Sequence, residues 1–179
     1  MAKIEKTVDV TLVNNITGGV YYNNRGAVLD LESFGDEGVL TFGELKTMAS
    51  SKYKSLLQNL TLLISEVDSE EFTAEDVIRE LRLTKYYKEL DDLSEDEIDY
   101  YDTNIVTDFV LNSELKEYDE KLKNPVLSHL LVDRTVQLYR EKELFSLDKL
   151  KSIAEYVVDD ELASKNDSQY GDYINDLLV

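Results

Sequence analysis

The sequence predicts an α+β fold, in which a small N-terminal antiparallel β module is followed by an acidic, mainly α-helical region. Six of the seven glycines lie at or before Gly43, where turns separate short apolar runs with the alternating pattern of β-strands. Beyond that point, capping patterns and apolar residues three or four positions apart are typical of helices. A chain of 179 residues with 42% apolar residues can bury a core without disulfides.

The first strand is expected in "TVDVTLV", where Val8, Val10 and Leu12 alternate with polar residues. The runs "VYY", "AVLDL" and "VLTF" follow, separated by turn-forming residues in "NNITGG", "NNRG" and "FGDEG". We therefore expect a small antiparallel sheet or a barrel-like module over residues 6–42. Gly18 and Gly19 match no phosphate-binding glycine motif, and we expect them in a hairpin turn.

Helix start signals begin at Thr41, which lies three residues before Glu44, the spacing of a capping box, and "ELKTMASSKYKSLLQNL" continues the predicted helix. Thr73 in "TAED" and Ser94 in "SEDE" carry the same signal, so we expect a helix after each of them. The run "LTLLI" over residues 60–64 could end the first helix or form a returning strand, and we favour the strand.

Two further helices are expected in the second half of the chain. Asn124 and Pro125 form an N-cap with proline at the first helical position, ahead of an apolar stretch that reaches Tyr139. Ser146 caps a helix with an apolar stripe of Leu147, Leu150, Ile153 and Val157. The apolar end "YINDLLV" is expected to dock on its own domain or on a partner, since exposure of this many apolar side chains is unfavourable.

The domain organisation follows from these patterns. Residues 1–64 are expected to form a β-rich N-terminal module with a helix, and residues 65–179 an acidic helical region. No stretch rich in Gly, Ser or Pro separates the two, so we expect one continuous chain without a flexible linker.

Negative charge is concentrated in one part of the chain. The net charge is −19, and residues 65–123 alone carry 20 acids and 7 bases. Such a block repels nucleic acids and anionic lipids, so we expect neither direct nucleic-acid binding nor membrane binding. Three interpretations stay open for it: a solvated surface, a contact with a basic protein, or a mimic of a nucleic-acid backbone.

The densest part of this block is "ELDDLSEDEIDYYD", where eight of the fourteen residues are acids. With Ser94 as a cap, some of these acids favour a helix start, because carboxylates are stabilised in the first turn. Tyrosine is enriched at protein interfaces, although each tyrosine doublet could instead place one ring in the core and one at the surface. The partner-binding residues predicted here are Asp91, Asp92, Glu95, Asp96, Tyr86 and Tyr100.

No motif in the sequence indicates catalysis. The chain has no cysteine and a single histidine, His129, which lies in "VLSHLLVD" and is expected to be structural or half-exposed. The acidic segments lack the glycine or the acid positions that an EF-hand loop requires, and with 38 acids any chosen carboxylate pair is uninformative. We expect no catalytic, cofactor or metal site and no enzyme activity.

Residues 8–48, "VDVTLVNNITGGVYYNNRGAVLDLESFGDEGVLTFGELKTM", combine a valine-rich strand, a turn into a strand with tyrosine, and "ELKTM", a helix start of the pattern E-L-[KR]-x-[LM]. This segment resembles the start of small uncharacterised proteins encoded among the virion genes of tailed bacteriophages. The resemblance implies a non-enzymatic phage structural or assembly protein that contacts other virion proteins or itself.

The N-terminus "MAKIEKTVDV" has no apolar signal region, so we do not expect a secreted protein. The resemblance implies the virion or the host cytoplasm as the location. The alternative is an acidic phage inhibitor, which would block a host nucleic-acid-binding defence protein by presenting acidic helices.

Overall fold

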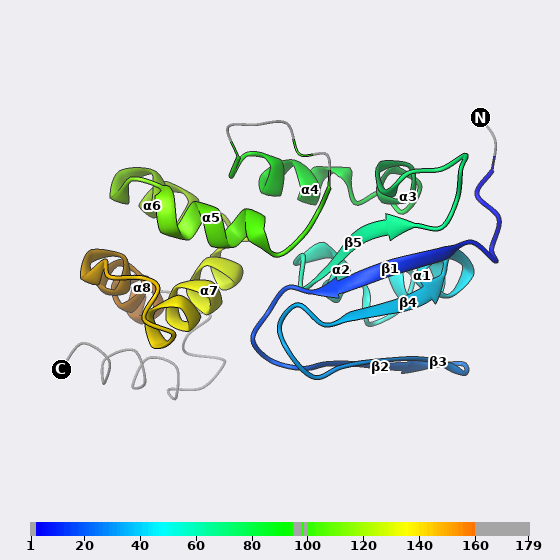
Figure 1. Ribbon diagram of the computed structural model, residues 1–179, viewed down its shortest axis with the longest axis horizontal. Helices are drawn as coiled ribbons and strands as arrows, with labels where there is room; N and C mark the ends of the chain where they lie inside the picture. Colours follow the sequence, from blue (N-terminus) through cyan, green and yellow to red (C-terminus); the bar gives the residue numbers. More distant parts are fainter. Residues whose placement is uncertain (1–2, 95–97, 99, 160–179) are drawn as a thin grey trace. The chain divides into compact units, whose positions relative to one another are not determined.

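The N-terminal strands and the helices that follow them confirm the α+β fold predicted from the sequence (Figure 1). The computed structural model describes residues 3–94, 98 and 100–159. The chain divides into two compact units, residues 1–106 and 107–179.

A three-stranded antiparallel sheet forms the centre of the first unit. Strand β1 (Asp9–Asn14) lies between β4 (Glu37–Thr41) and β5 (Leu62–Val67). Val10 and Leu12 are fully buried, as their alternation predicts. Strand β5 also confirms the strand that was favoured for residues 60–64.

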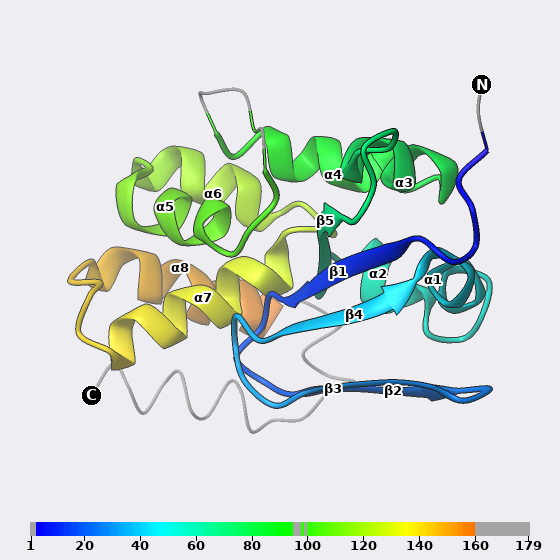
Figure 2. The ribbon, with the colours of Figure 1, turned by 45° about the vertical axis from the view of Figure 1, so that its right-hand side comes forward.

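Strands β2 (Val20–Asn24) and β3 (Ala27–Leu31) form a separate antiparallel hairpin, which runs alongside β4 in both ribbon views (Figures 1 and 2). The hairpin packs closely on β4, because a Cβ atom at Gly38 would lie 2.4 Å from Leu29 Cδ1. The predicted hairpin turn at Gly18 and Gly19 is wrong: they connect β1 to β2, and these strands pair with different neighbours.

The capping box predicted at Thr41 is present at the start of helix α1 (Phe42–Ala49). The continuous helix expected after it is interrupted, and a short helix α2 (Lys54–Gln58) follows. Two serines lie at this break, and their hydroxyl groups bond to nearby backbone carbonyls. Ser50 Oγ donates to the carbonyl oxygen of Lys46, and Ser51 Oγ to that of Met48, each at 2.8 Å.

Helix α3 (Ala74–Glu80) begins at Thr73, where the predicted cap forms a capping box with Asp76. Helix α4 (Thr84–Asp91) follows, and the next helix is α5 (Asn104–Asn112). The helix predicted directly after Ser94 is not present at Ile98 or at residues 100–103, while residues 95–97 and 99 lie outside the described ranges. Asp102 starts α5 instead, since its carboxylate accepts from the Asn104 amide at 2.8 Å.

The second unit contains helices α6 (Leu115–Leu122), α7 (Ser128–Arg140) and α8 (Leu147–Asp159). Helix α7 begins later than predicted, because Asn124 accepts from the Val126 amide in a turn over residues 125–127. In α8, Leu150 and Ile153 are buried as predicted, whereas Leu147 is 50% exposed. The side chain of Val157 and the apolar C-terminal segment lie outside the described residues.

Polar groups also hold the helices of the second unit together. The hydroxyl groups of Tyr118 and Thr135 lie 2.6 Å apart and join α6 to α7. The buried Lys149 ammonium donates to the carbonyl oxygens of Val110 and Ser113, at 2.6 and 2.8 Å, and thus satisfies the C-terminal end of α5. No helix within the described ranges has both the length and the apolar character needed to cross a membrane.

Candidate functional site

The predicted partner-binding segment begins on α4, which is anchored to the sheet by Tyr87. Strand β5 has a bulge at Ser65, since Thr11 pairs with Glu66 and Leu12 with Ile64. The backbone N–H of Ile64 donates to the Tyr87 hydroxyl at 2.8 Å. Burial raises the pKa of Tyr87 above its usual range, so the hydroxyl stays neutral.

Tyr101 connects the segment after α4 back to this helix. Its ring meets that of Tyr87 edge to face, with centroids 4.7 Å apart, and its hydroxyl donates to Asp91 Oδ1 at 3.0 Å. Burial raises the pKa of Asp91, and the hydrogen bond from Tyr101 opposes that shift. Asp91, predicted as a partner-binding residue, therefore also has a role within the fold.

Each of Tyr87, Asp91 and Tyr101 has a neighbour in the sequence that lies closer to the surface. Tyr100 is 47% exposed, Asp92 is exposed, and Tyr86 is half-buried with the Lys85 ammonium 4.6 Å from its ring centroid. Each tyrosine doublet thus places one ring in the core and one at the surface, which was the alternative interpretation of the doublets. Glu95 and Asp96 lie outside the described residues.

We define the acidic contact surface as Tyr86, Asp92 and Tyr100. Each is the covalent neighbour of a member of the bonded group Tyr87, Asp91 and Tyr101, so the three lie in one region of the first unit. His129, in the second unit, is half-buried. Among the described residues, no group of three or more His, Asp or Glu side chains is placed to hold a metal ion.

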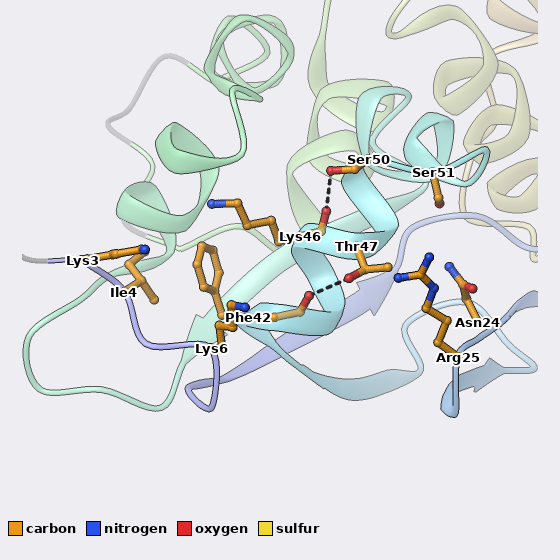
Figure 3. Close-up of a pocket in the computed structure, with 11 residues that line it drawn as sticks. Lys3, Ile4, Lys6, Asn24, Arg25, Phe42, Lys46, Thr47, Ser50 and Ser51 are labelled. Carbon is orange, nitrogen blue, oxygen red and sulfur yellow. Dashed lines mark hydrogen bonds between the residues drawn. The ribbon is translucent and has the colours of Figure 1, made fainter.

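A second candidate site is a pocket of about 500 Å³ in the first unit, which the sequence did not predict (Figure 3). Four cationic side chains line it, and no acid does. We call it the cationic pocket. Its lining residues are Lys3, Ile4, Lys6, Asn24, Arg25, Phe42, Gly43, Lys46, Thr47, Ser50 and Ser51.

One wall of the cationic pocket is the N-terminal segment, which is held against the start of α1. The amide of Gly43 donates to the carbonyl oxygen of Lys6 at 3.0 Å, and that of Phe42 to Val8 at 2.7 Å. Glycine eases this approach, because a Cβ atom at residue 43 would lie 3.1 Å from Lys6 Cβ and 3.2 Å from its carbonyl oxygen, which is a tight contact. The backbone therefore holds Lys6 beside α1.

The opposite wall is the β2–β3 turn. Figure 3 shows Asn24 and Arg25 on one side of the α1 side chains, Lys3 and Ile4 on the other, and the Arg25 guanidinium directed toward Thr47. Arg25 and Gly26 are the two central residues of the turn, with φ of 52° and 91°, as in a type I′ turn. The turn thus projects a cation across the pocket.

The cations of this pocket come from three separate stretches of a strongly acidic chain, so no local sequence motif contains them. One signal was available: residues 44–64 carry three bases and one acid, against the trend of the chain. Comparison with known proteins identifies no relative, since no family model, no curated protein and no solved structure matches this chain.

Proposed function

We propose that the protein is a non-enzymatic phage structural or assembly protein, which binds a basic protein partner through the acidic contact surface. The observation that carries this proposal is Tyr100. Its ring is 47% exposed, although the adjacent Tyr101 is buried and bonded to Asp91. An aromatic ring held at the surface beside carboxylates is typical of the residues that dominate binding energy at protein interfaces.

The charge distribution supports a basic partner. Residues 65–123 have a partial charge of −13, so an acidic partner or a nucleic acid would be repelled. The resemblance of residues 8–48 to proteins encoded among phage virion genes supports other virion proteins as partners. The alternative of nucleic-acid mimicry receives less support, because α4 carries two cations, Lys85 and Lys88, besides its carboxylates.

The test uses particles of the phage that encodes the chain. Mass spectrometry of purified particles should detect the protein, and the double variant D92K/Y100A should be incorporated severalfold less than the wild type. The double variant Y21A/D30K is a matched control, because Tyr21 and Asp30 are exposed and face each other on the β2–β3 hairpin.

Two results would contradict the proposal. Absence of the chain from purified particles would exclude a structural role, and equal incorporation of both double variants would exclude the acidic contact surface. Circular dichroism spectra and melting temperatures of the purified variants establish that any loss of incorporation is not a loss of folding.

A further inference from the structure

We propose that the cationic pocket binds a compact anionic ligand with two or more phosphate groups. The lining residues carry four positive charges, from Lys3, Lys6, Arg25 and Lys46, in a chain whose net charge is −19. Cations that line one pocket without an acid among them give it a positive potential, which attracts an anion. Arginine and lysine are the side chains that commonly bind phosphate.

Three of the four cations are available for a ligand as the structure stands. Lys3, Lys6 and Arg25 take part in no ion pair with the described residues. Lys46 pairs with Glu80 at 3.1 Å, but both side chains are about half exposed, and such pairs contribute little to stability. A bound anion can therefore replace Glu80 as the partner of Lys46.

The acid nearest in sequence to Lys46 does not neutralise the pocket. Glu44 belongs to the capping box, where its Oε2 atom accepts from the Thr41 amide at 2.8 Å and from the Thr41 hydroxyl at 2.9 Å. This carboxylate is thus committed to the N-terminus of α1. Glu44 therefore does not neutralise Lys46.

The backbone of Arg25 gives an independent indication of function. The first central residue of a type I′ turn is usually Asn, Asp or Gly, because φ is positive there. Arginine at φ 52° adopts this conformation at a cost, and strained residues of this kind cluster at binding sites. An arginine at this position directs a guanidinium toward Thr47 in the pocket lining (Figure 3), which the shorter asparagine side chain could not do.

The chemistry of the pocket favours phosphate groups over an aromatic ligand. Ile4 and Phe42 are buried, and the Lys46 ammonium lies 5.6 Å from the Phe42 ring centroid, so no open ring face is offered for stacking. The hydroxyl groups of Thr47, Ser50 and Ser51 donate to backbone carbonyls. Charged groups are therefore the main donors to a ligand.

The size of the ligand follows from charge and volume. Two or three phosphate groups match the four cations in charge, and a volume of about 500 Å³ is within the range of small-molecule sites. An extended nucleic acid would pass beyond the pocket onto a chain that is acidic overall.

Isothermal titration calorimetry of the full chain with tripolyphosphate, pyrophosphate and orthophosphate tests the proposal. Affinity should rise in the order orthophosphate, pyrophosphate, tripolyphosphate, and should fall as salt is added. The variants Arg25→Asn and Lys6→Gln should each weaken tripolyphosphate binding by about tenfold, as expected for the loss of a charged hydrogen bond. Lys52→Gln and Lys54→Gln are matched controls, because these exposed lysines of the same unit do not line the pocket.

Arg25→Asn also separates binding from folding. Asparagine tolerates the positive φ, so this variant should keep or raise the melting temperature while it loses affinity. The proposal is overturned if the wild type does not bind tripolyphosphate at millimolar concentration, or if the control variants weaken binding as much as the pocket variants. Tighter, Arg25-dependent binding of a ten-nucleotide single-stranded DNA would also overturn it, and would assign the pocket to a nucleic-acid backbone.

Discussion

Tyr87 provides the sharpest test of how the first unit is held together. The variant Tyr87→Phe removes one oxygen atom and keeps the ring, which is 2% exposed and packs edge to face on Tyr101. That oxygen accepts from the backbone N–H of Ile64 at the bulge of β5, and Ile64 is itself fully buried. The substitution therefore leaves a buried donor without an acceptor.

The expected cost is about 1–3 kcal/mol of the free energy of unfolding, the range for a buried polar group that loses its partner. The aromatic contact, which contributes roughly 0.5–1.5 kcal/mol, is retained because the ring does not change. Out of a total stability of roughly 5–15 kcal/mol for a typical domain, such a loss is readily measured.

Urea unfolding followed by circular dichroism measures this loss by linear extrapolation. Hydrogen exchange of the Ile64 amide, followed by NMR, should accelerate in the variant, since opening at the bulge becomes easier. Tyr86→Phe is the control, because it removes the same atom from a half-buried neighbour on α4. If Tyr87→Phe costs no more than Tyr86→Phe, the Tyr87 hydroxyl does not hold α4 to β5.

Three further predictions concern other contacts. Gly38→Ala should destabilise the protein by more than about 1 kcal/mol, because its Cβ atom would lie 2.4 Å from Leu29 Cδ1, and an unchanged melting temperature would contradict this packing. Asp76→Asn should destabilise at pH 7, because the hydrogen bond from the Thr73 amide lowers the pKa of Asp76 below 3.8. The Asp76 carboxylate stabilises the fold above that pH, and this contribution is lost as the pH falls through the lower pKa of the folded state. Urea unfolding at several pH values measures the difference in stability between Asp76→Asn and the wild type. A difference that does not change with pH would contradict the prediction. Lys142→Gly should stabilise by about 0.5–1 kcal/mol, because residue 142 has φ 63° after α7; a lower melting temperature would show that the lysine side chain matters more than the backbone strain.

Local signals in the sequence predicted much of the fold. Thr41 and Glu44, and likewise Thr73 and Asp76, form their capping boxes within four residues, so no distant contact is needed to recognise them. The predicted helix after Ser94 fails in the described residues for the opposite reason. Tyr101 is drawn into a contact with Tyr87 on α4, a tertiary interaction that a local pattern does not reveal.

The candidate sites also combine features that the sequence shows with features that only the tertiary structure shows. An acidic segment with tyrosines is visible in the sequence, but only the contacts of Tyr101 show that Asp91 serves the fold while Asp92 and Tyr100 face outward. The cationic pocket could not be predicted, because Lys3, Arg25 and Lys46 are more than twenty residues apart from one another along the chain.

Alone, the sequence determined the α+β class, the capped starts of α1 and α3 and the concentration of negative charge, because each depends on composition or on residues within one turn of one another. Only the tertiary structure decided where the tyrosine rings point and that four cations share one pocket. The pocket exists because the Gly43 amide binds the carbonyl oxygen of Lys6 and the Arg25–Gly26 turn lies across from α1. Both features are long-range, and therefore depend on how the strands pair.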